Sequence, residues 1–247
     1  MKKLSVLVLF LVFVSASVFA WQKTPAANAV DVAVAENGTV VVANRAGELW
    51  ISRDAGTNWS QTPASGVARV SMNSDASIIG IVNRAGEFWV SRDRGTTWTQ
   101  TNATNVADAS VGRSNTFVVN RAGEVWFSPN DFASWTQTNV TNMKVVIFGG
   151  PFILLVDNAG VVHTADFNRQ QSLAVRRTPG TDAADMDVSP NGQAWVVNAA
   201  GEMWFSRDRG ATWNRDPDNA ANVVAVSTTN RYTFVVNRDG EVWFKRN

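Results

Sequence analysis

Hydrophobic and polar residues alternate with a period of two along much of the chain, which is the spacing of β-strands and not of helices. Residues 124–128 read Glu-Val-Trp-Phe-Ser, and residues 116–119 and 233–236 are runs of β-branched and aromatic side chains. Side chains of these types are enriched in strands. The pattern therefore predicts an all-β protein built from short strands and turns.

One turn sequence recurs along the chain. Five-residue segments related to Asn-Arg-Ala-Gly-Glu begin at Asn44, Asn83, Asn120, Asp157, Asn198 and Asn237. Their starts are 39, 37, 37, 41 and 39 residues apart. A period of about 38 residues, sustained to the C-terminus, is typical of repeat architectures. Residues 21–247 are therefore predicted to form one domain.

Two turn types follow from the repeat. Asn at the first position and Gly at the fourth suit a type I turn that ends in a left-handed glycine. A second pattern, Ser-x-Asp-x-Gly-x-x-Trp, occupies residues 52–59, 91–98 and 206–213, and residues 128–135 keep only its ends. This is the Asp-box pattern, in which the Ser hydroxyl and the Asp carboxylate accept hydrogen bonds from turn amides.

Each repeat is predicted to supply four short strands: an inner strand such as 108–111, the Val-rich strand, the Glu-x-Trp strand and a short outer strand after the Asp-box Trp. Six such sheets predict a six-bladed β-propeller. The last repeat ends at Asn247 without an outer strand, whereas residues 21–26 align with residues 59–64. We therefore expect the strand after Trp21 to complete the sixth blade and close the ring.

The amino-acid composition excludes several kinds of functional site. The chain of 247 residues has no cysteine, one histidine, 11 tryptophans, and 22 basic against 21 acidic residues. Disulfides, zinc–thiolate sites, a cysteine nucleophile and any site with two imidazoles are therefore excluded. The near-neutral charge argues against a protein that binds duplex nucleic acid. The sequence predicts no metal and no cofactor.

The first twenty residues have the pattern of a signal peptide. Lys2 and Lys3 are followed by an apolar run at 4–14, and Val18-Phe19-Ala20 resembles a cleavage site. The apolar run is too short to span a bilayer, and no later stretch is long enough. We expect a secreted or periplasmic protein without a membrane span, whose mature chain begins at Trp21.

The repeat unit resembles the tectonin repeat. The resemblance rests on Trp98-Thr-Gln-Thr, Ala107-Asp108-Ala109-Ser110-Val111-Gly112, Phe117-Val118-Val119-Asn120 and Gly123-Glu124-Val125-Trp126. It covers residues 21–247 and implies a six-bladed propeller lectin that binds lipopolysaccharide or O-methylated glycans in clefts between blades. The Asp-boxes also resemble those of sialidase-type (BNR) propellers and of photosystem-assembly propellers.

Ten tryptophans fall into two slots of the repeat. The third-strand slot holds Trp50, Trp89, Trp126, Trp204 and Trp243, and the outer-strand slot holds Trp21, Trp59, Trp98, Trp135 and Trp213. A position fixed by the repeat favours packing over sugar stacking, although aromatic faces suit both roles. Trp195 stands where Phe117 and Phe234 stand in other repeats and is predicted to be core.

The candidate ligand contacts are polar side chains that the turns do not require. Arg45, Arg84, Arg121 and Arg238 occupy the second turn position, where almost any residue is accepted. Such guanidinium groups either bind an anionic ligand, or are solvated or paired with the Glu three positions later. Thr101, Asn102 and Asn105, in a loop from an outer to an inner strand, are the other candidate contacts.

The repeat itself argues against catalysis, because an enzyme site on a propeller shows as non-repeated polar insertions. The single tyrosine, Tyr232, is predicted to pack in a hairpin and not to act as a sialidase nucleophile. His163 takes a Trp slot near Asp166 and is predicted to fill space, with a ligand or base role as the alternative.

The fourth repeat, about residues 144–177, departs from the others and carries an insertion around Gln170-Gln171-Ser172. It is either a diverged blade or the contact surface for a protein partner. The sequence thus favours a non-enzymatic lectin-like propeller that binds glycans or lipopolysaccharide through several weak sites. A protein-interaction scaffold is the alternative, and a sialidase-like glycoside hydrolase comes third.

Overall fold

The computed structural model describes residues 21–129, 132–149, 152–167, 172–218 and 220–247. The predicted signal peptide and the Gln170-Gln171 part of the predicted insertion lie outside this range. Within it, the structure is entirely β-strands and turns, and no helix is present that could cross a membrane. The all-β prediction is confirmed.

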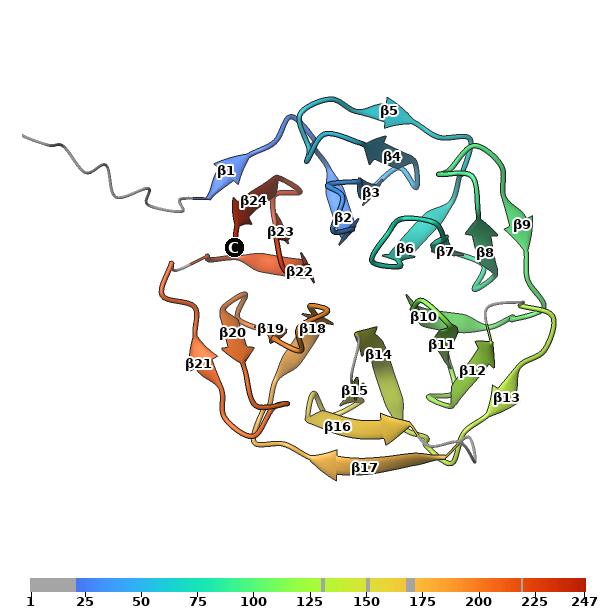
Figure 1. Cartoon of the computed structure of the whole chain (residues 1–247), viewed down its shortest axis with the longest axis vertical. Coiled ribbons are helices and arrows are strands. Elements are labelled where there is room, and N and C mark those ends of the chain that lie inside the picture. Colours follow the sequence, from blue (N-terminus) through green and yellow to red (C-terminus); the bar gives the residue numbers. More distant parts are fainter. Residues whose placement is uncertain (1–20, 130–131, 150–151, 168–171, 219) are drawn as a thin grey trace, which may run out of the picture.

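Six antiparallel sheets of four strands each surround a common axis (Figure 1), and this arrangement confirms the predicted six-bladed propeller. Blade 1 consists of β2 (Ala29–Val34), β3 (Val40–Asn44), β4 (Leu49–Ser52) and β5 (Ser60–Gln61). Blade 2 consists of β6 (Val67–Met72), β7 (Ile79–Asn83), β8 (Phe88–Ser91) and β9 (Thr99–Gln100). Blade 3 consists of β10 (Val106–Val111), β11 (Asn115–Asn120), β12 (Val125–Pro129) and β13 (Thr136–Gln137).

The second half of the ring repeats this order. Blade 4 consists of β14 (Met143–Gly149), β15 (Phe152–Asp157), β16 (Val162–Phe167) and β17 (Leu173–Arg177). Blade 5 consists of β18 (Ala183–Val188), β19 (Ala194–Asn198), β20 (Met203–Ser206) and β21 (Asn214–Arg215). Blade 6 consists of β22 (Val223–Thr228), β23 (Tyr232–Asn237), β24 (Val242–Arg246) and β1 (Gln22–Lys23).

The N-terminal strand β1 closes the ring, as the alignment of residues 21–26 with 59–64 predicts. It pairs antiparallel with β24, Gln22 opposite Phe244 and Lys23 opposite Trp243. The sheet order of blade 6 is β1-β24-β23-β22, so strands from both ends of the chain share one blade (Figure 1). Closure leaves no open side at the junction between first and last blade.

The hydrophobic cores lie between adjacent blades. One cluster joins Phe117 of β11 to Ile153 and Leu155 of β15, and Phe117 and Leu155 are fully buried. Trp195 belongs to the cluster between blades 5 and 6 and is 5% exposed, so its predicted core position is confirmed. Blades are thus held together by side chains that point away from their own sheet on both faces.

Because consecutive strands are antiparallel, the connections alternate between two faces of the ring. The turn face carries the Asn-x-x-Gly turns and the loops from each outer strand to the next inner strand. The hairpin face carries the inner-strand hairpins and the Ser-x-Asp-x-Gly-x-x-Trp turns. On the turn face, Gly47 has φ +83°, and a Cβ on it would lie 3.0 Å from the Cα of Gly66 in the next blade's entry loop. Glycine is required there both by backbone conformation and by space.

Candidate functional site: clefts between the blades

The Asn-x-x-Gly turns build a repeated polar network at the outer end of the turn face. In blade 1 the Asn44 side-chain oxygen accepts hydrogen bonds from the amides of Ala46 and Glu48, both at 3.0 Å. The Asn44 amide nitrogen donates to the Glu48 carboxylate at 2.7 Å, and the Trp50 indole donates to the same oxygen at 3.1 Å. Glu48 therefore orients the third-strand tryptophan.

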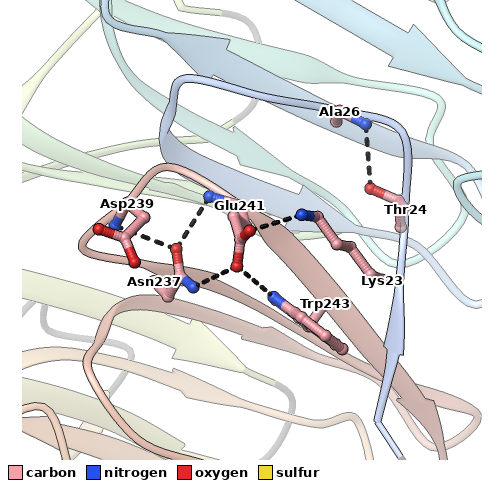
Figure 2. Close-up of polar contacts among 7 residues, drawn as sticks. All are labelled: Lys23, Thr24, Ala26, Asn237, Asp239, Glu241 and Trp243. Atoms are coloured by element: carbon pink, nitrogen blue, oxygen red, sulfur yellow. Dashed lines mark hydrogen bonds and ion pairs between the residues drawn. The ribbon is translucent and has the colours of Figure 1, made fainter.

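The same network in blade 6 includes the ring-closing strand. Figure 2 shows Asn237, Glu241 and Trp243 in these contacts, with the Lys23 ammonium on the Glu241 carboxylate. These donors, Lys23 first, lower the pKa of Glu241 to about 2. Lys23 and Glu241 thus link the two ends of the chain by charge at the turn face.

The turn arginines form a chain from blade to blade. Each donates through its guanidinium to the backbone oxygen at the same position of the preceding turn: Arg45 to Arg238 at 2.6 Å, Arg84 to Arg45 at 2.6 Å, Arg121 to Arg84 at 2.8 Å, and Arg238 to Ala199 at 2.8 Å. All four side chains are exposed. Their remaining N–H groups face solvent along an arc of four consecutive blades.

The expected pairing of these arginines with the Glu three positions later is wrong, whereas their exposure agrees with the solvated state that was its alternative. In the described residues no ion pair joins a turn arginine to the Glu three positions later, because that carboxylate is held by the turn Asn and, in blades 1, 2, 3 and 6, by the third-strand Trp. The guanidinium groups instead bridge neighbouring turns.

A first cleft lies where the loop after β1 meets blade 1. This Trp59 cleft has a volume of about 460 Å³ and is lined by Pro25, Ala27, Asn44, Glu48, Trp50 and Trp59, among others. Both tryptophans are half-buried. The cleft therefore presents two aromatic rings beside a carboxylate and a side-chain amide.

A second cleft lies between blades 2 and 3. This Asn102 cleft has a volume of about 390 Å³ and is lined by Arg92, Asp93, Gln100, Thr101, Asn102 and Phe132, among others. The Arg92 guanidinium lies over the Phe132 ring at 5.2 Å from its centroid. Phe132 is buried and its ring is covered by Arg92, so this cleft presents amide, hydroxyl and charged groups.

The loop residues predicted as contacts separate into different roles. Asn102 is exposed, and its side-chain amide donates to the Ala133 oxygen across the cleft at 3.3 Å. Thr101 is buried, and its hydroxyl donates to the Phe88 oxygen at 3.0 Å, which is a structural contact. Asn105 does not line either cleft; it has φ +58° and its backbone oxygen accepts from the Arg121 amide at 2.8 Å. The structure brings Thr101 and Asn102 together, away from the arginine arc.

The Ser-x-Asp-x-Gly-x-x-Trp turns have repeated contacts on the hairpin face. In blade 1 the Ser52 hydroxyl accepts from the Gly56 amide at 2.9 Å, and the Asp54 carboxylate accepts from the Asn58 amide at 2.8 Å. Bonds from the Asn58 backbone, the Asn58 side chain and the Ser52 hydroxyl, in that order, lower the pKa of Asp54 to about 2. Asp93, beside the Asn102 cleft, has equivalent bonds and a pKa of about 2.

The inner strands enclose a charged channel that the sequence analysis missed. This central channel has a volume of about 420 Å³, and Asp31, Arg69, Asp108, Asp185 and Asp187 line it. The first four share one position of the inner strand in blades 1, 2, 3 and 5. The sequence signal for this channel is a charged residue that recurs at one position of an otherwise apolar strand.

Carboxylates in the central channel tie one blade to the next. Asp31 accepts from the Val70 amide at 2.8 Å, Asp108 from the Val146 amide at 3.0 Å, and Asp185 from the Val226 amide at 2.8 Å. Every acceptor and donor pair joins adjacent blades. These carboxylates therefore have a structural partner already, which argues against a site built on them.

Burial is the largest cause of the raised pKa values of the carboxyl groups in the central channel. It raises the pKa of Asp108 to about 6 and that of Asp187 to about 6. It raises the pKa of Asp185 to about 8, with the charge of Asp31 adding to the effect. Arg69 counters part of this, and the carboxylates around it, Asp31 first, raise its own pKa.

His163 replaces the third-strand Trp of blade 4, but it contacts a different turn position from that of the tryptophans, which donate to the Glu at the fifth position. Its Nε2 lies 2.9 Å from the carboxylate of Asp157, which stands at the first turn position. Asp166, expected near His163, forms its ion pairs with Arg176 and Arg209 instead. His163 therefore stands in the Trp slot as a half-buried imidazole beside a carboxylate. Among the described residues, no group of three His, Asp or Glu side chains is arranged to hold a metal ion.

No protein-family model matches the chain, and no curated protein matches it in sequence. Solved structures do. YCF48 from Cyanidioschyzon merolae is 15% identical with a TM-score of 0.57, covering 92% of this chain and 98% of that chain. A structure of YCF48 bound to D1 peptide is 14% identical with a TM-score of 0.62, covering 92% and 94%.

The GH74 xyloglucanase from Xanthomonas campestris is also similar, at 14% identity and a TM-score of 0.59. The match covers 89% of this chain but 37% of that enzyme. At these identities the similarity extends to the propeller fold alone.

Proposed function

We propose that this chain is an exported, non-enzymatic propeller that binds surface glycans, such as lipopolysaccharide or O-methylated sugars, in clefts between its blades. The observation that carries the proposal is the composition of the Trp59 and Asn102 clefts. The Trp59 cleft, of about 460 Å³, places two half-buried tryptophans beside an amide and a carboxylate, and the Asn102 cleft, of about 390 Å³, gathers amide, hydroxyl and charged groups. The tectonin resemblance of the repeat supports the same ligand class.

The chemistry of a sugar suits such a cleft. Aromatic faces pack against the apolar C–H surface of a pyranose, and a few fixed polar groups bind its hydroxyls. In the Trp59 cleft, Glu48 holds the Trp50 ring in place through the indole N–H at 3.1 Å. The ring is therefore pre-organised, which reduces the entropy lost on binding.

The arginine arc adds a second element for an anionic glycan. Arg238, Arg45, Arg84 and Arg121 lie on consecutive blades of the turn face, and each keeps donors free after its contact with the preceding turn. Guanidinium groups bind phosphate and carboxylate well. Several weak contacts on one rigid ring give firm attachment to a polyvalent surface.

A glycan array and a lipopolysaccharide pull-down test this proposal with the protein displayed multivalently. Trp50→Leu and Asn102→Ala each remove a cleft group, and we expect a loss of at least about tenfold in apparent affinity. Trp204→Leu, in the same slot of blade 5 and outside both clefts, is the matched control. Absence of binding at high protein concentration would refute the glycan function.

The non-enzymatic part of the proposal has its own test. A GH74 xyloglucanase shares the fold, and a sialidase-like hydrolase is the remaining enzymatic alternative. We expect no turnover of xyloglucan or of a fluorogenic sialoside above the blank rate. If hydrolysis is measured and persists after repurification, the non-enzymatic proposal is wrong and the function is catalysis.

A protein partner at blade 4 is the second candidate function. YCF48 has been solved with a D1 peptide bound, so a propeller of this shape accepts a peptide. Blade 4 breaks the repeat at several positions, including the loss of both Trp slots. Cross-linking should capture a partner that is lost when blade 4 is restored to the repeat pattern.

A further inference from the structure

Blade 4 differs from the other blades at its outer edge. Its outer strand β17 has five residues, whereas β1, β5, β9, β13 and β21 have two each. Four of its five residues are exposed, and Val175 is the exposed large hydrophobic residue of the described chain, at 36%. β17 is the last strand of its sheet, so one edge is unpaired (Figure 1).

The register fixes which backbone groups that edge presents. β17 pairs antiparallel with β16, with Leu173 opposite Phe167, Val175 opposite Ala165 and Arg177 opposite His163. The Thr178 amide donates to the Val162 oxygen at 3.0 Å, so Thr178 faces β16. Since antiparallel strands alternate between inward and outward residues, the N–H and C=O groups of Leu173, Val175 and Arg177 point outward.

One outward position is already occupied, and it shows how the edge is recognised. The Asn139 side chain accepts from the Leu173 amide at 2.8 Å and donates to the Leu173 oxygen at 3.2 Å. An amide thus pairs with this edge as a neighbouring strand would. Val175 and Arg177 follow with four further main-chain groups in the same direction.

We propose that β17 is a docking edge to which an extended, acidic segment of a protein partner adds as a fifth strand of blade 4. This inference rests on the second candidate function, a protein partner at blade 4, and is independent of glycan binding. Strand addition uses main-chain hydrogen bonds for affinity and alternate side chains for specificity. A β-branched residue suits the position opposite Val175.

The charge of the edge selects the partner. Arg177 is exposed and lies on the same face of β17 as Val175, while Arg176 on the other face is paired with Asp166. A second copy of this chain would bring two cationic edges together, which is unfavourable. An acidic residue opposite Arg177 instead gains a cross-strand ion pair. The edge therefore favours an acidic foreign segment over self-association.

The test uses fluorescence anisotropy with labelled heptapeptides in which Val or Ile alternates with Glu at every second residue, with Thr at the positions between, so that the apolar and acidic side chains share the face of Val175 and Arg177. Peptides of the same composition with a central proline are the peptide controls. We expect saturable binding of the alternating peptides to the mature chain and none of the proline peptides, which lack a ladder donor. A dissociation constant on the order of 1 mM is the weakest affinity that the proposal covers. If no alternating peptide binds at 1 mM, the docking-edge proposal is refuted.

Two variants separate the edge from the fold. Val175→Pro removes an outward N–H that β16 does not use, so the blade should keep its pairing while peptide affinity falls at least about tenfold. Arg177→Glu should reverse the preference, so that Lys-containing heptapeptides bind better than Glu-containing ones. Arg113→Glu, a charge reversal in the blade 3 hairpin, should leave peptide affinity unchanged. Unchanged affinity in both edge variants would refute the proposal.

The same variants distinguish this inference from the broader function. If a cross-linked partner persists in Val175→Pro but is lost when blade 4 is restored to the repeat pattern, strand addition is refuted. The broader proposal of a protein partner at blade 4 is then retained. Glycan binding should be equal in wild type and Val175→Pro, because β17 lines neither cleft.

Discussion

Single charged side chains inside the ring carry much of its pH behaviour. Asp185 lies in the central channel and accepts from the Val226 amide at 2.8 Å. Its pKa is raised to about 8, mainly because burial disfavours the ionised form. A carboxyl whose pKa is raised on folding binds a proton that the unfolded chain has already lost. It therefore stabilises the fold at low pH and loses that effect as pH rises through the folded pKa.

Asp185→Asn should make thermal stability less dependent on pH between about 5 and 8, because stability falls with pH between the unfolded pKa of 3.8 and the folded pKa of about 8. Wild type should lose on the order of a few °C in Tm across this window relative to the variant, because only the unfolded wild-type chain gains stability by ionising residue 185. Above about pH 9 the pH slopes of the two proteins should converge, because Asp185 is then ionised in both the folded and the unfolded chain. Thermal unfolding followed by circular dichroism over this pH range measures the difference.

The control for Asp185→Asn is a carboxylate whose pKa is lowered on folding instead of raised. Asp54 has a pKa lowered to about 2, so its stabilisation is present above the unfolded pKa and lost as pH falls toward 2. Asp54→Asn should alter stability at neutral pH but not the slope between about pH 5 and 8. Equal slopes in wild type and Asp185→Asn would show that Asp185 does not hold this proton.

At the scale of the strand, blade 6 replaces a turn by a buried ion pair. Lys245 of β24 occupies the slot of Ser52 in β4, and Asp216 occupies the slot of Thr62. The Lys245 ammonium is 3.1 Å from the Asp216 carboxylate, and their side chains are 7% and 1% exposed. Lys245 also lies over the rings of Trp21 and Trp195. Blade 6 lacks a Ser-x-Asp-x-Gly-x-x-Trp turn. Both substitutions occur at this place, so the ion pair fills the space that such a turn would occupy.

Lys245→Ser should destabilise the protein by on the order of 3 kcal/mol, because it leaves the buried Asp216 carboxylate without its cationic partner. Adding Asp216→Thr restores the repeat residues at both slots and should recover at least about 1 kcal/mol of that loss. Urea unfolding of wild type, both single variants and the double variant gives the coupling energy. Additive effects of the two substitutions would show that the pair does not act as a unit.

At the scale of the whole molecule, stability depends on a strand that joins the ring without a covalent link to its blade. β1 contributes two residues to blade 6, and its contacts with β24 include the Lys23 and Glu241 ion pair (Figure 2). Trp21 packs beside it against the cluster between blades 5 and 6. Loss of β1 would open the edge of β24.

Trp21→Ala should therefore release blade 6 before the rest of the ring unfolds. We expect the amides of β24 to exchange at least about ten times faster by hydrogen exchange, through opening of this one blade. Trp98→Ala removes the same slot from blade 2, where the outer strand is held in a continuous chain, and should leave β8 amides protected to the global limit. Similar local opening in both variants would contradict a special role for closure.

The sequence alone determined the fold, because its information is periodic. Asn and Gly at fixed offsets specify turns locally, alternation specifies strands, and six repeats with one strand missing at the C-terminus require closure by residues after Trp21. The half-buried Trp slots and the core position of Trp195 followed from the same alignment. All of these depend on neighbours within one repeat or on repeat number.

Only the tertiary structure decided what lies between repeats. The arginine chain across neighbouring turns, the clefts around Trp59 and Asn102, the separation of Asn105 from them and the outward backbone groups of β17 are contacts between blades or at a blade edge. Asp185 looks like a surface residue in an alternating strand until six inner strands enclose it. Burial and pKa depend on that enclosure, which no single repeat encodes.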